Sequence, residues 1–296
     1  TLVERGAAGL PVLTRVATVP ASGVPPVSDR RHSPALARLH AVWGLGQLAH
    51  EHPAALVPLR SLLRDRDAEV RAQSAKVLGA QRHASDAEAL VAALKDTSER
   101  VRFFAAQGLG KIGRPEAARP LLALARENND SDNYVRHAIV MGLVGTNNLE
   151  ALAAGARSGS RAERLAVLLA YRRLGRPEIA GFLTDPDPYL VREAAIAIND
   201  TPIPEARPAL AALIEKPLTD EPVIFRVLNT HFRLGRPENA AALATYAARS
   251  DAPARLRAEA LAQLSAWPKP PQRDRIVGVY RPFALSPSSR DRAVVV

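Results

Sequence analysis

The sequence predicts an all-α protein, a right-handed α-solenoid of about eight helical hairpins, and three observations favour it. A short motif returns along the chain at a nearly constant interval. The core must be aliphatic, because hydrophobic residues make up 47% of the chain and aromatic residues only 4%. A Gly-Arg-Pro-Glu turn occurs three times. Repetition of this kind is typical of a solenoid, whose units contact only their neighbours.

The repeated motif is an apolar residue followed by Arg. Successive copies lie 28 to 34 residues apart, which is too long for one helix and too short for a domain. The first copy has His40 in the Arg place, and the fifth has Glu163 in the apolar place. The eight copies are Leu39-His40, Val70-Arg71, Val101-Arg102, Val135-Arg136, Glu163-Arg164, Val191-Arg192, Phe225-Arg226 and Leu256-Arg257.

Residues 99–112 and the turn after them show why each unit should be a helical hairpin. Gly113 begins the first Gly-Arg-Pro-Glu turn, and the other copies begin at Gly175 and Gly235. Gly favours the left-handed conformation that ends a helix, and Pro fits the first turn of the next helix. The residues before the turn have helical spacing and form one apolar stripe. The stripe consists of Val101, Phe104, Ala105, Gly108 and Ile112.

Acidic turns separate the hairpins at residues 64–67, 95–98, 185–188 and 220–222. Asp and Ser are favoured N-caps, and acidic charge interacts favourably with a helix N-terminus. Each turn therefore predicts the start of the helix that carries the repeated Arg.

The beginning of the chain departs from the repeat. We expect the end of a helix at residues 2–5, a break at Gly6, a helix over 7–17 and a polar, proline-rich loop over 18–33. Because the chain opens in a helix end without Met, we expect it to be a piece of a longer protein.

The repeat stops after Trp267, where three prolines forbid further helix. The predicted domains are a solenoid over residues 1–267 and a C-terminal extension over residues 268–296. We expect short strands at residues 276–280 and 293–296. A terminal repeat needs its apolar face covered, so we expect the extension to cap the last repeat. The covering residues would be Val277, Tyr280, Phe283, Val294, Val295 and Val296.

The hairpin, the Asp-rich turn followed by Val-Arg and the Gly ending resemble HEAT repeats of the short prokaryotic kind over residues 1–267. The resemblance implies an armadillo-like scaffold in which the Asp of a turn pairs with the Arg of the helix, in a ladder between adjacent repeats. His40 and Glu163 interrupt the ladder. The implied pairs are Asp65 or Asp67 with Arg71, Asp96 with Arg102, Asp132 with Arg136, Asp187 with Arg192, Asp220 with Arg226 and Asp251 with Arg257.

A narrower resemblance rests on residues 37–46 and 274–282. These segments look like parts of large bacterial proteins of the membrane-bound or sugar-dehydrogenase type, in which a quinoprotein β-propeller, HEAT repeats and a cytochrome c module follow one another. The resemblance implies a spacer between a catalytic propeller and a haem domain, in the periplasm or cell envelope. Without it, a cytoplasmic location is expected.

The formal net charge of +10 fits nucleic acid, an anionic membrane surface or an acidic partner. Of the 40 basic residues only five are Lys, and both Lys and stacking aromatics are scarce for a phosphate-binding face. We expect an Arg beside an Asp to be satisfied locally and to stiffen the stack. The candidates for an exposed basic patch are Arg172, Arg173, Arg176, Arg233 and Arg236.

No signature of catalysis stands out, and the chain has no Cys, which excludes thiolate metal sites and haem attachment within it. His50 and His52 are one residue apart and have poor metal geometry on a helix. We therefore expect no cofactor and no metal. Trp43 and Trp267 lie in opposite end repeats, which argues against a HEAT-like lyase or DNA glycosylase.

The sequence therefore predicts a non-catalytic scaffold that binds a protein partner, or neighbouring domains of the same chain, along its concave face. A basic HEAT protein that binds nucleic acid is the alternative, and a HEAT-like lyase or glycosylase is the third hypothesis. No apolar run is long enough for a membrane span.

Overall fold

The structure is a computed structural model that describes residues 2–19 and 34–283. Within them, all regular structure is helical apart from one isolated β-bridge between Arg273 and Tyr280. The all-α solenoid prediction is confirmed, while the handedness stays a prediction. The expected strand at 276–280 is wrong, since the segment forms a tight loop. The strand expected at 293–296 and most of the loop expected over 18–33 lie outside the described residues.

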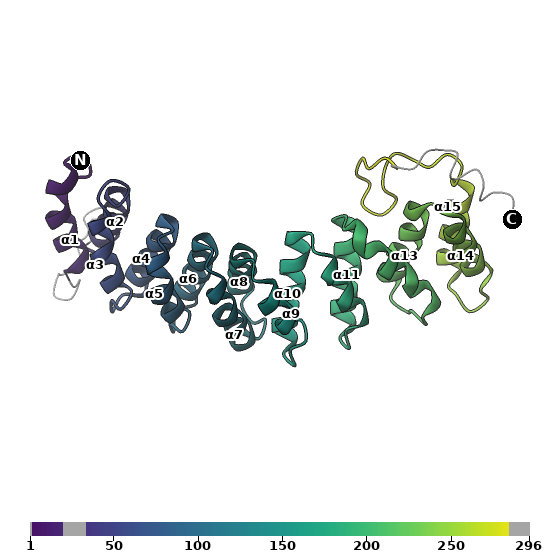
Figure 1. Ribbon diagram of the computed structural model, residues 1–296, viewed down its shortest axis with the longest axis horizontal. Helices are drawn as coiled ribbons and strands as arrows, with labels where there is room; N and C mark the ends of the chain where they lie inside the picture. The colour runs from purple at the N-terminus through teal and green to yellow at the C-terminus, as the bar shows by residue number, and fades with distance from the viewer. Residues whose placement is uncertain (1, 20–33, 284–296) are drawn as a thin grey trace. The chain divides into compact units, whose positions relative to one another are not determined.

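The helices pair into hairpins, each with a first and a second helix (Figure 1). The described residues hold eight pairs, in agreement with the prediction. They are α1 (Leu10–Thr18) with α2 (Pro34–Leu48), α3 (Leu56–Leu62) with α4 (Ala68–Gln81), α5 (Ala87–Ala93) with α6 (Glu99–Ile112), α7 (Ala118–Asn128) with α8 (Asn133–Thr146), α9 (Leu149–Gly155) with α10 (Arg161–Leu174), the 3-10 helix η6 (Pro177–Thr184) with α11 (Pro188–Asp200), α12 (Arg207–Ala211) and η8 (Ala212–Glu215) with α13 (Glu221–Leu234), and α14 (Pro237–Ala248) with α15 (Ala254–Ser265).

Short 3-10 turns lead into several first helices. They are η1 (Gly6–Gly9), η3 (Pro53–Ala55), η4 (Ala84–Asp86), η5 (Pro115–Ala117) and η7 (Pro204–Ala206). The Gly-Arg-Pro-Glu turns behave as predicted. Gly113, Gly175 and Gly235 adopt φ angles of 76°, 64° and 68°, and the Pro two residues later opens the next element.

The first helix of the sixth hairpin is a 3-10 helix throughout, which the sequence did not indicate. η6 has 8 residues, whereas α7 has 11. A 3-10 helix rises about 2.0 Å per residue and an α-helix about 1.5 Å, so both elements span roughly 16 Å. The tighter winding lets a shorter segment, with Gly181 in its middle, reach across the hairpin.

The chain divides into two compact units, residues 1–170 and 171–296, with the boundary inside α10. The predicted solenoid over 1–267 is therefore a continuous series of hairpins that forms more than one compact unit. We call these parts unit 1 and unit 2 and describe each by itself.

In unit 1 the second helices approach one another closely because glycines face each other. A Cβ on Gly79 would lie 2.3 Å from the Cα of Gly108, and one on Gly145 would lie 2.0 Å from the carbonyl oxygen of Gly110. The first helices are further apart: hollows of about 470 and 500 Å³ lie between α3 and α5 and between α7 and α9. The second helices therefore line the inner side of unit 1.

Unit 2 has a core cluster built from its last two hairpins. Trp267, 1% exposed, packs edge to face on Phe232, with ring centroids 5.8 Å apart. Leu228, Leu243 and Leu256 complete the centre of this cluster. The Trp that ends the repeat is therefore a core residue.

Part of the C-terminal extension folds back on the second helices of unit 2. Phe283 packs against the core cluster, with its ring 5.3 Å from that of Phe232. Val277 is half-buried, whereas Tyr280 is 67% exposed, so its predicted covering role is wrong. The predicted cover by Val294, Val295 and Val296 lies outside the described residues.

The facing glycines lead to a stability prediction. We expect Gly79→Ala to destabilise the protein by about 1–3 kcal/mol, because the added methyl group meets backbone rather than a movable side chain. Chemical denaturation followed by circular dichroism measures the change. Gly159→Ala is the matched control in unit 1, since its Cβ would have no heavy atom within 4 Å. Equal unfolding midpoints for the two variants would show that close helix approach is unimportant.

Candidate functional site

In unit 1 the repeated Arg joins two successive turns. Nη1 of Arg71 donates to the backbone carbonyls of Asp65 and Arg66, at 2.9 and 3.2 Å. Nε and Nη2 of Arg71 donate to both carboxylate oxygens of Asp96, at 2.7 and 2.8 Å. Bidentate pairs of this kind are strong and fix geometry. Arg71 therefore ties its own turn to the turn of the next repeat.

The Arg71–Asp96 pair is largely covered, with side chains 14% and 12% exposed. The hydrogen bond from Arg71 holds the pKa of Asp96 below its usual value, although burial opposes the shift. The same bond raises the pKa of Arg71. Both groups therefore stay charged at neutral pH, and the interaction between the repeats is preserved.

The contact with backbone carbonyls recurs at the same spacing. Arg102 donates to the carbonyls of Asp96 and Thr97, at 2.7 and 3.2 Å. Arg164 donates to those of Ser158 and Gly159, at 2.9 and 3.4 Å. In each copy the acceptors lie six and five residues before the Arg. The repeated Arg thus satisfies carbonyls that the end of a turn would otherwise leave to solvent.

The carboxylates are used differently from the prediction. Asp67, Asp132, Asp187 and Asp220 accept hydrogen bonds from the first backbone N–H groups of the following helix. Such N-caps hold the carboxylate at the helix start, so the Arg one turn later finds other acceptors. Asp96 pairs with Arg71 of the preceding repeat, whereas Arg102 reaches only its backbone carbonyl.

The pairing within one turn is therefore corrected in most repeats. Arg257, in the last one, has a buried Nε with no hydrogen-bond partner among the described residues. The ion pairs that replace the predicted ones are Arg136 with Asp130, Arg192 with Asp220, Arg226 with Asp200 and Arg249 with Asp251.

The two exceptions to the motif have structural explanations. Arg38, not His40, fills the Arg role in the first repeat: it is 4% exposed, pairs with Asp65 and donates to the Ala17 carbonyl at 3.0 Å. His40 is exposed and lies edge-on to Trp43.

Glu163, 5% exposed, lies where the other repeats have an apolar residue, and its carboxylate has hydrogen-bond partners. Its carboxylate accepts hydrogen bonds from the Ser158 hydroxyl at 2.6 Å and from Arg126 at 2.8 Å. The buried carboxylate thereby links α7 to α10 within the repeat stack.

The residues predicted to form a basic patch differ in exposure and in pairing. Arg176 makes two hydrogen bonds to Glu178, at 2.6 and 3.1 Å, and Arg236 lies 3.9 Å from Glu238, because the Gly-Arg-Pro-Glu turn carries its own carboxylate. The Arg233 side chain is 6% exposed beneath the C-terminal extension. Arg173 and Arg236 are exposed, as predicted, and Arg172 is half-buried.

A polar and aromatic strip crosses the second helices of unit 1. Nε1 of Trp43 donates to Gln73 at 2.9 Å, and Nε2 of Gln73 donates to Glu69 at 2.7 Å. Arg100 reaches Glu69 from α6 at 2.7 Å, and its guanidinium lies 5.2 Å from the centre of the Phe104 ring. We call this network, together with Lys76, Phe103 and Tyr134, the inner strip.

The inner strip leaves large side chains open to solvent. Trp43 is 40% exposed and Tyr134 is 78% exposed. A hollow of about 260 Å³ lies between the first turns of α6 and α8, lined by Arg100, Phe103 and Tyr134 among others. The Lys76 ammonium lies 5.6 Å from the centre of the Phe104 ring, so cations and aromatic rings alternate on this surface.

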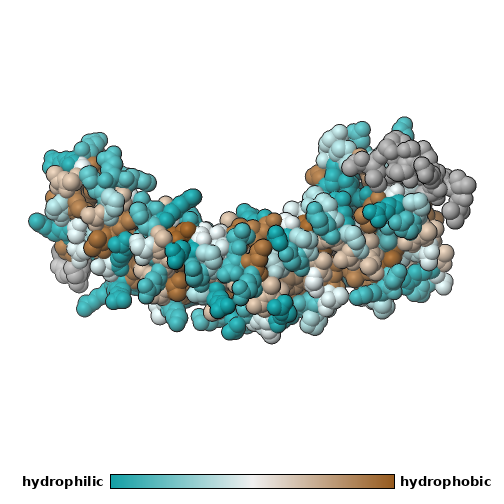
Figure 2. Space-filling model, viewed as in Figure 1, coloured by the Kyte–Doolittle hydropathy of each residue, from teal (hydrophilic) through white to brown (hydrophobic). Residues whose placement is uncertain are grey.

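Hydrophobic residues do not form one continuous patch on the face seen in Figure 2, where brown residues are interspersed with hydrophilic ones. A partner of such a mixed surface needs both polar and aromatic complementarity, as in the cores and rims of protein interfaces.

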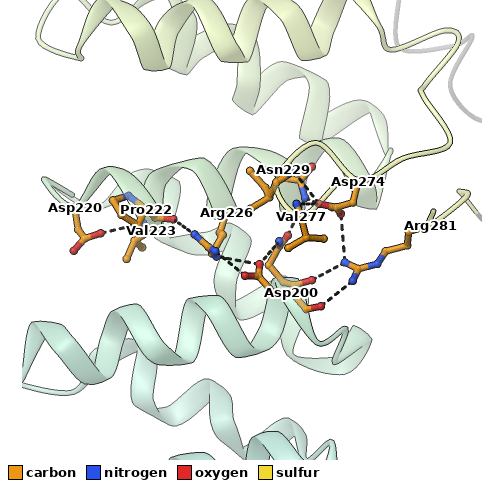
Figure 3. Close-up of polar contacts among 11 residues, drawn as sticks. Asp200, Asp220, Pro222, Val223, Arg226, Asn229, Asp274, Val277 and Arg281 are labelled. Atoms are coloured by element: carbon orange, nitrogen blue, oxygen red, sulfur yellow. Dashed lines mark hydrogen bonds and ion pairs between the residues drawn. The ribbon is translucent and has the colours of Figure 1, made fainter. Parts of the chain in front are cut away.

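In unit 2 a buried polar network joins the second helices to residues 272–283, which we call the strap (Figure 3). Arg226 pairs with Asp200 at 2.6 Å, and the Asn199 amide donates to Asp200 at 2.9 Å. The Asn229 amide donates to Asn199 at 2.9 Å and to Asp274 of the strap at 3.2 Å. The network therefore continues from the interrepeat pairs into the extension.

Arg281 anchors the other side of the strap. It donates to the backbone carbonyls of Asn199 and Asp200, both at 2.8 Å, at the C-terminal end of α11. It also lies 3.3 Å from Asp274, as does Arg233 of α13. A guanidinium is favoured at a helix C-terminus, where carbonyls lack partners.

Asp274 is fully buried and remains ionised. Burial by itself would raise its pKa, but the backbone N–H groups of Ile276 and Val277, the Asn229 amide and Arg233 together hold the pKa below its usual value. A carboxylate with this many donors stabilises the loop around it.

Sequence reasoning missed Asp200 and Asp274. The signal for Asp274 was present: Asp followed four residues later by Gly favours a tight turn, and Gly278 has a φ of 69°. Nothing in the local sequence shows that this turn docks on α11 and α13.

Among the described residues, no cluster of His, Asp and Glu has the arrangement of a metal site. No helix of the described part is both long and apolar enough to cross a membrane.

Two overlapping segments, residues 27–99 and 58–144, match the family model for HEAT repeats. Together the two matched segments span residues 27–144, and this part of the chain is similar to HEAT repeats. A search of curated proteins found no match.

Several solved structures resemble the chain at low identity. Human deoxyhypusine hydroxylase in complex with glycerol is 21% identical, with 89% of this chain and 97% of that chain covered and a TM-score of 0.35. YibA of Escherichia coli is 15% identical, with coverages of 86% and 96% and a TM-score of 0.40. The archaeal HEAT-like repeats protein of Thermococcus onnurineus is 15% identical, with coverages of 77% and 92% and a TM-score of 0.39. Likenesses this distant carry no argument about function.

The shifted ladder leads to a double-mutant prediction. Arg71→Ala and Asp96→Ala, alone and together, should give a coupling energy of about 1–3 kcal/mol, since the pair is covered and bidentate. The cycle of Asp67→Ala with Arg71→Ala is the control and should give a coupling close to zero. Denaturant unfolding measures both. A larger coupling energy for the Asp67 cycle than for the Asp96 cycle would support the pairing within one turn that the resemblance implies.

Asp274 leads to a pH prediction. Because its folded pKa is lowered, its stabilising contribution is present above its ordinary value of 3.8 and is lost as pH falls through the lower folded value. At pH 6, Asp274→Asn should lower the free energy of unfolding by at least about 1 kcal/mol. The difference from wild type should shrink below about pH 4, as measured by thermal unfolding. Glu205→Gln, an exposed change in unit 2, is the control. A difference that persists unchanged at pH 3 would contradict the assignment.

Proposed function

We propose that the chain is a non-catalytic scaffold that docks a protein segment along the inner strip of unit 1. The exposure of Tyr134 and Trp43 on the second helices carries this proposal. Exposed Trp and Tyr beside cations are favoured anchors of protein interfaces, because they bury much area at a low cost in side-chain entropy.

Packing alone does not account for the inner strip. The second helices are already held by facing glycines and by the Arg71–Asp96 pair. Tyr134 extends from the first turn of α8 and leaves most of its surface in water. A surface already stabilised elsewhere is free to carry residues suited to a partner.

Nucleic-acid binding is the second candidate, favoured by the net charge of +10. Many of the 40 basic residues are engaged in ion pairs between repeats, such as Arg71 with Asp96 and Arg226 with Asp200, so fewer of them are available to contact phosphates than their number suggests. A catalytic role as a lyase or glycosylase receives less support still, because Trp267 is buried and cannot stack on a base.

The link to dehydrogenase-type proteins of the cell envelope receives no support from the comparisons and stays a prediction. A Cys-x-x-Cys-His motif encoded after Val296 would support it, and with it the periplasmic location.

The docking proposal is tested with a phage-displayed peptide library selected on the full chain. Peptides that bind should lose at least tenfold in affinity, about 1.4 kcal/mol, on the double variant Trp43→Ala/Tyr134→Ala. Isothermal titration calorimetry measures the change. Val57→Ala is the matched control, because Val57 is 58% exposed on a first helix.

Three outcomes would contradict the proposal: no enriched peptide, equal losses on the control variant, or tight binding of a DNA duplex. Duplex binding with a steep salt dependence that the double variant abolishes would favour the nucleic-acid candidate.

A further inference from the structure

The strap is held on the second helices of unit 2 mainly by polar contacts and one aromatic ring rather than by a continuous apolar interface. Asp274 is its one fully buried residue, while Val279 and Tyr280 are 48% and 67% exposed. Its other anchors are the Arg281 guanidinium, the Phe283 ring and Arg275, which donates two hydrogen bonds to Glu259 of α15, at 2.7 and 2.9 Å. Arg233 contributes to both ends, since its guanidinium lies 4.6 Å from the centre of that ring. A carboxylate, two cations and an aromatic ring therefore fix the strap at four points.

The surface beneath the strap has the features of a docking surface. It offers two backbone carbonyls at the end of α11, the Asn229 amide and the Arg233 guanidinium. The Asn229 side-chain oxygen is buried and has no hydrogen-bond partner among the described residues. A cap that served only the core would not need to cover so many polar groups.

The strap is also held weakly for the number of contacts it makes. Opening it returns Asp274, Arg233 and Arg281 to water, and the hydration regained offsets most of the ionic attraction lost. Burial lowers the pKa of Arg207; nearby Arg281 lowers it further and Asp274 raises it, so the docked strap places both a like and an opposite charge near Arg207. Among the strap residues, only Phe283 packs against the core cluster. Segments with few apolar contacts open first.

We propose that the second-helix surface of unit 2 is a docking surface, that the strap is its intramolecular occupant, and that a protein loop of the pattern Asp-x6-Arg-x-Phe displaces it. The pattern repeats the spacing of Asp274, Arg281 and Phe283. The incoming carboxylate pairs with Arg233 and accepts from the Asn229 amide. The incoming guanidinium donates to the α11 carbonyls, and the incoming ring packs against Phe232. This surface lies in unit 2 and does not depend on docking at the inner strip.

The experiment uses the full chain and a fluorescein-labelled synthetic peptide of residues 270–283. The variant Arg281→Ala/Phe283→Ala weakens the strap and leaves Asp274 paired with Arg233. It should bind the peptide at least tenfold more tightly than wild type by fluorescence anisotropy. Tyr280→Ala, a change at an exposed position of the same strap, should bind like wild type. A peptide with Ala at the Asp274, Arg281 and Phe283 positions should not bind.

A second measurement addresses displacement in the wild type. Saturating unlabelled peptide should increase hydrogen exchange at the amides of Ile276 and Val277. A folded double variant that binds no more tightly than wild type would overturn the proposal. Loss of helical circular dichroism in that variant would also overturn it, because the strap would then be an integral part of the core.

Discussion

The structure depends on one guanidinium contact, made by the repeated Arg. A stack of hairpins leaves carbonyls unsatisfied at the end of every turn, and each turn must also be tied to the next. Arg71 does both, with one nitrogen on its own turn and two on the following carboxylate. Because Arg is always charged and planar, it can make these contacts at once, whereas Lys cannot. These contacts therefore fix the relative orientation of the two turns and also stabilise their packing.

The same contact explains the composition of the chain. The repeated Arg uses carbonyls or carboxylates of the turns, so many of the 40 basic residues serve the repeat stack. The Gly-Arg-Pro-Glu turns add a local pair, as between Arg176 and Glu178. The number of basic residues therefore says less about partners here than in a globular protein, where basic residues have fewer fixed acceptors.

Sequence reasoning predicted what depends on local structure. The turns at Gly113, Gly175 and Gly235 were predictable because Gly and Pro each have one backbone role there. The choice of carboxylate for Arg71 was not, since Asp67 and Asp96 differ only in tertiary placement. The interruption of the ladder at His40 was predicted wrongly for the same reason: Arg38, two residues earlier, reaches the neighbouring turn. Asp274 was missed because its partners lie 41 and 45 residues earlier in the chain, at Arg233 and Asn229.

The second-helix surfaces of unit 1 and unit 2 are stabilised in different ways. In unit 1 facing glycines and the Arg71–Asp96 pair stabilise the stack from within, so the residues above them are not needed for packing and remain exposed. In unit 2 the network that begins at Arg226 and Asp200 extends outward to Asn229. The Asn229 amide nitrogen donates one hydrogen bond within the network and needs a further acceptor for its second N–H. Asp274 supplies that acceptor from the strap. Where interrepeat pairs are complete, the surface is open; where the network reaches the surface, another segment must complete it.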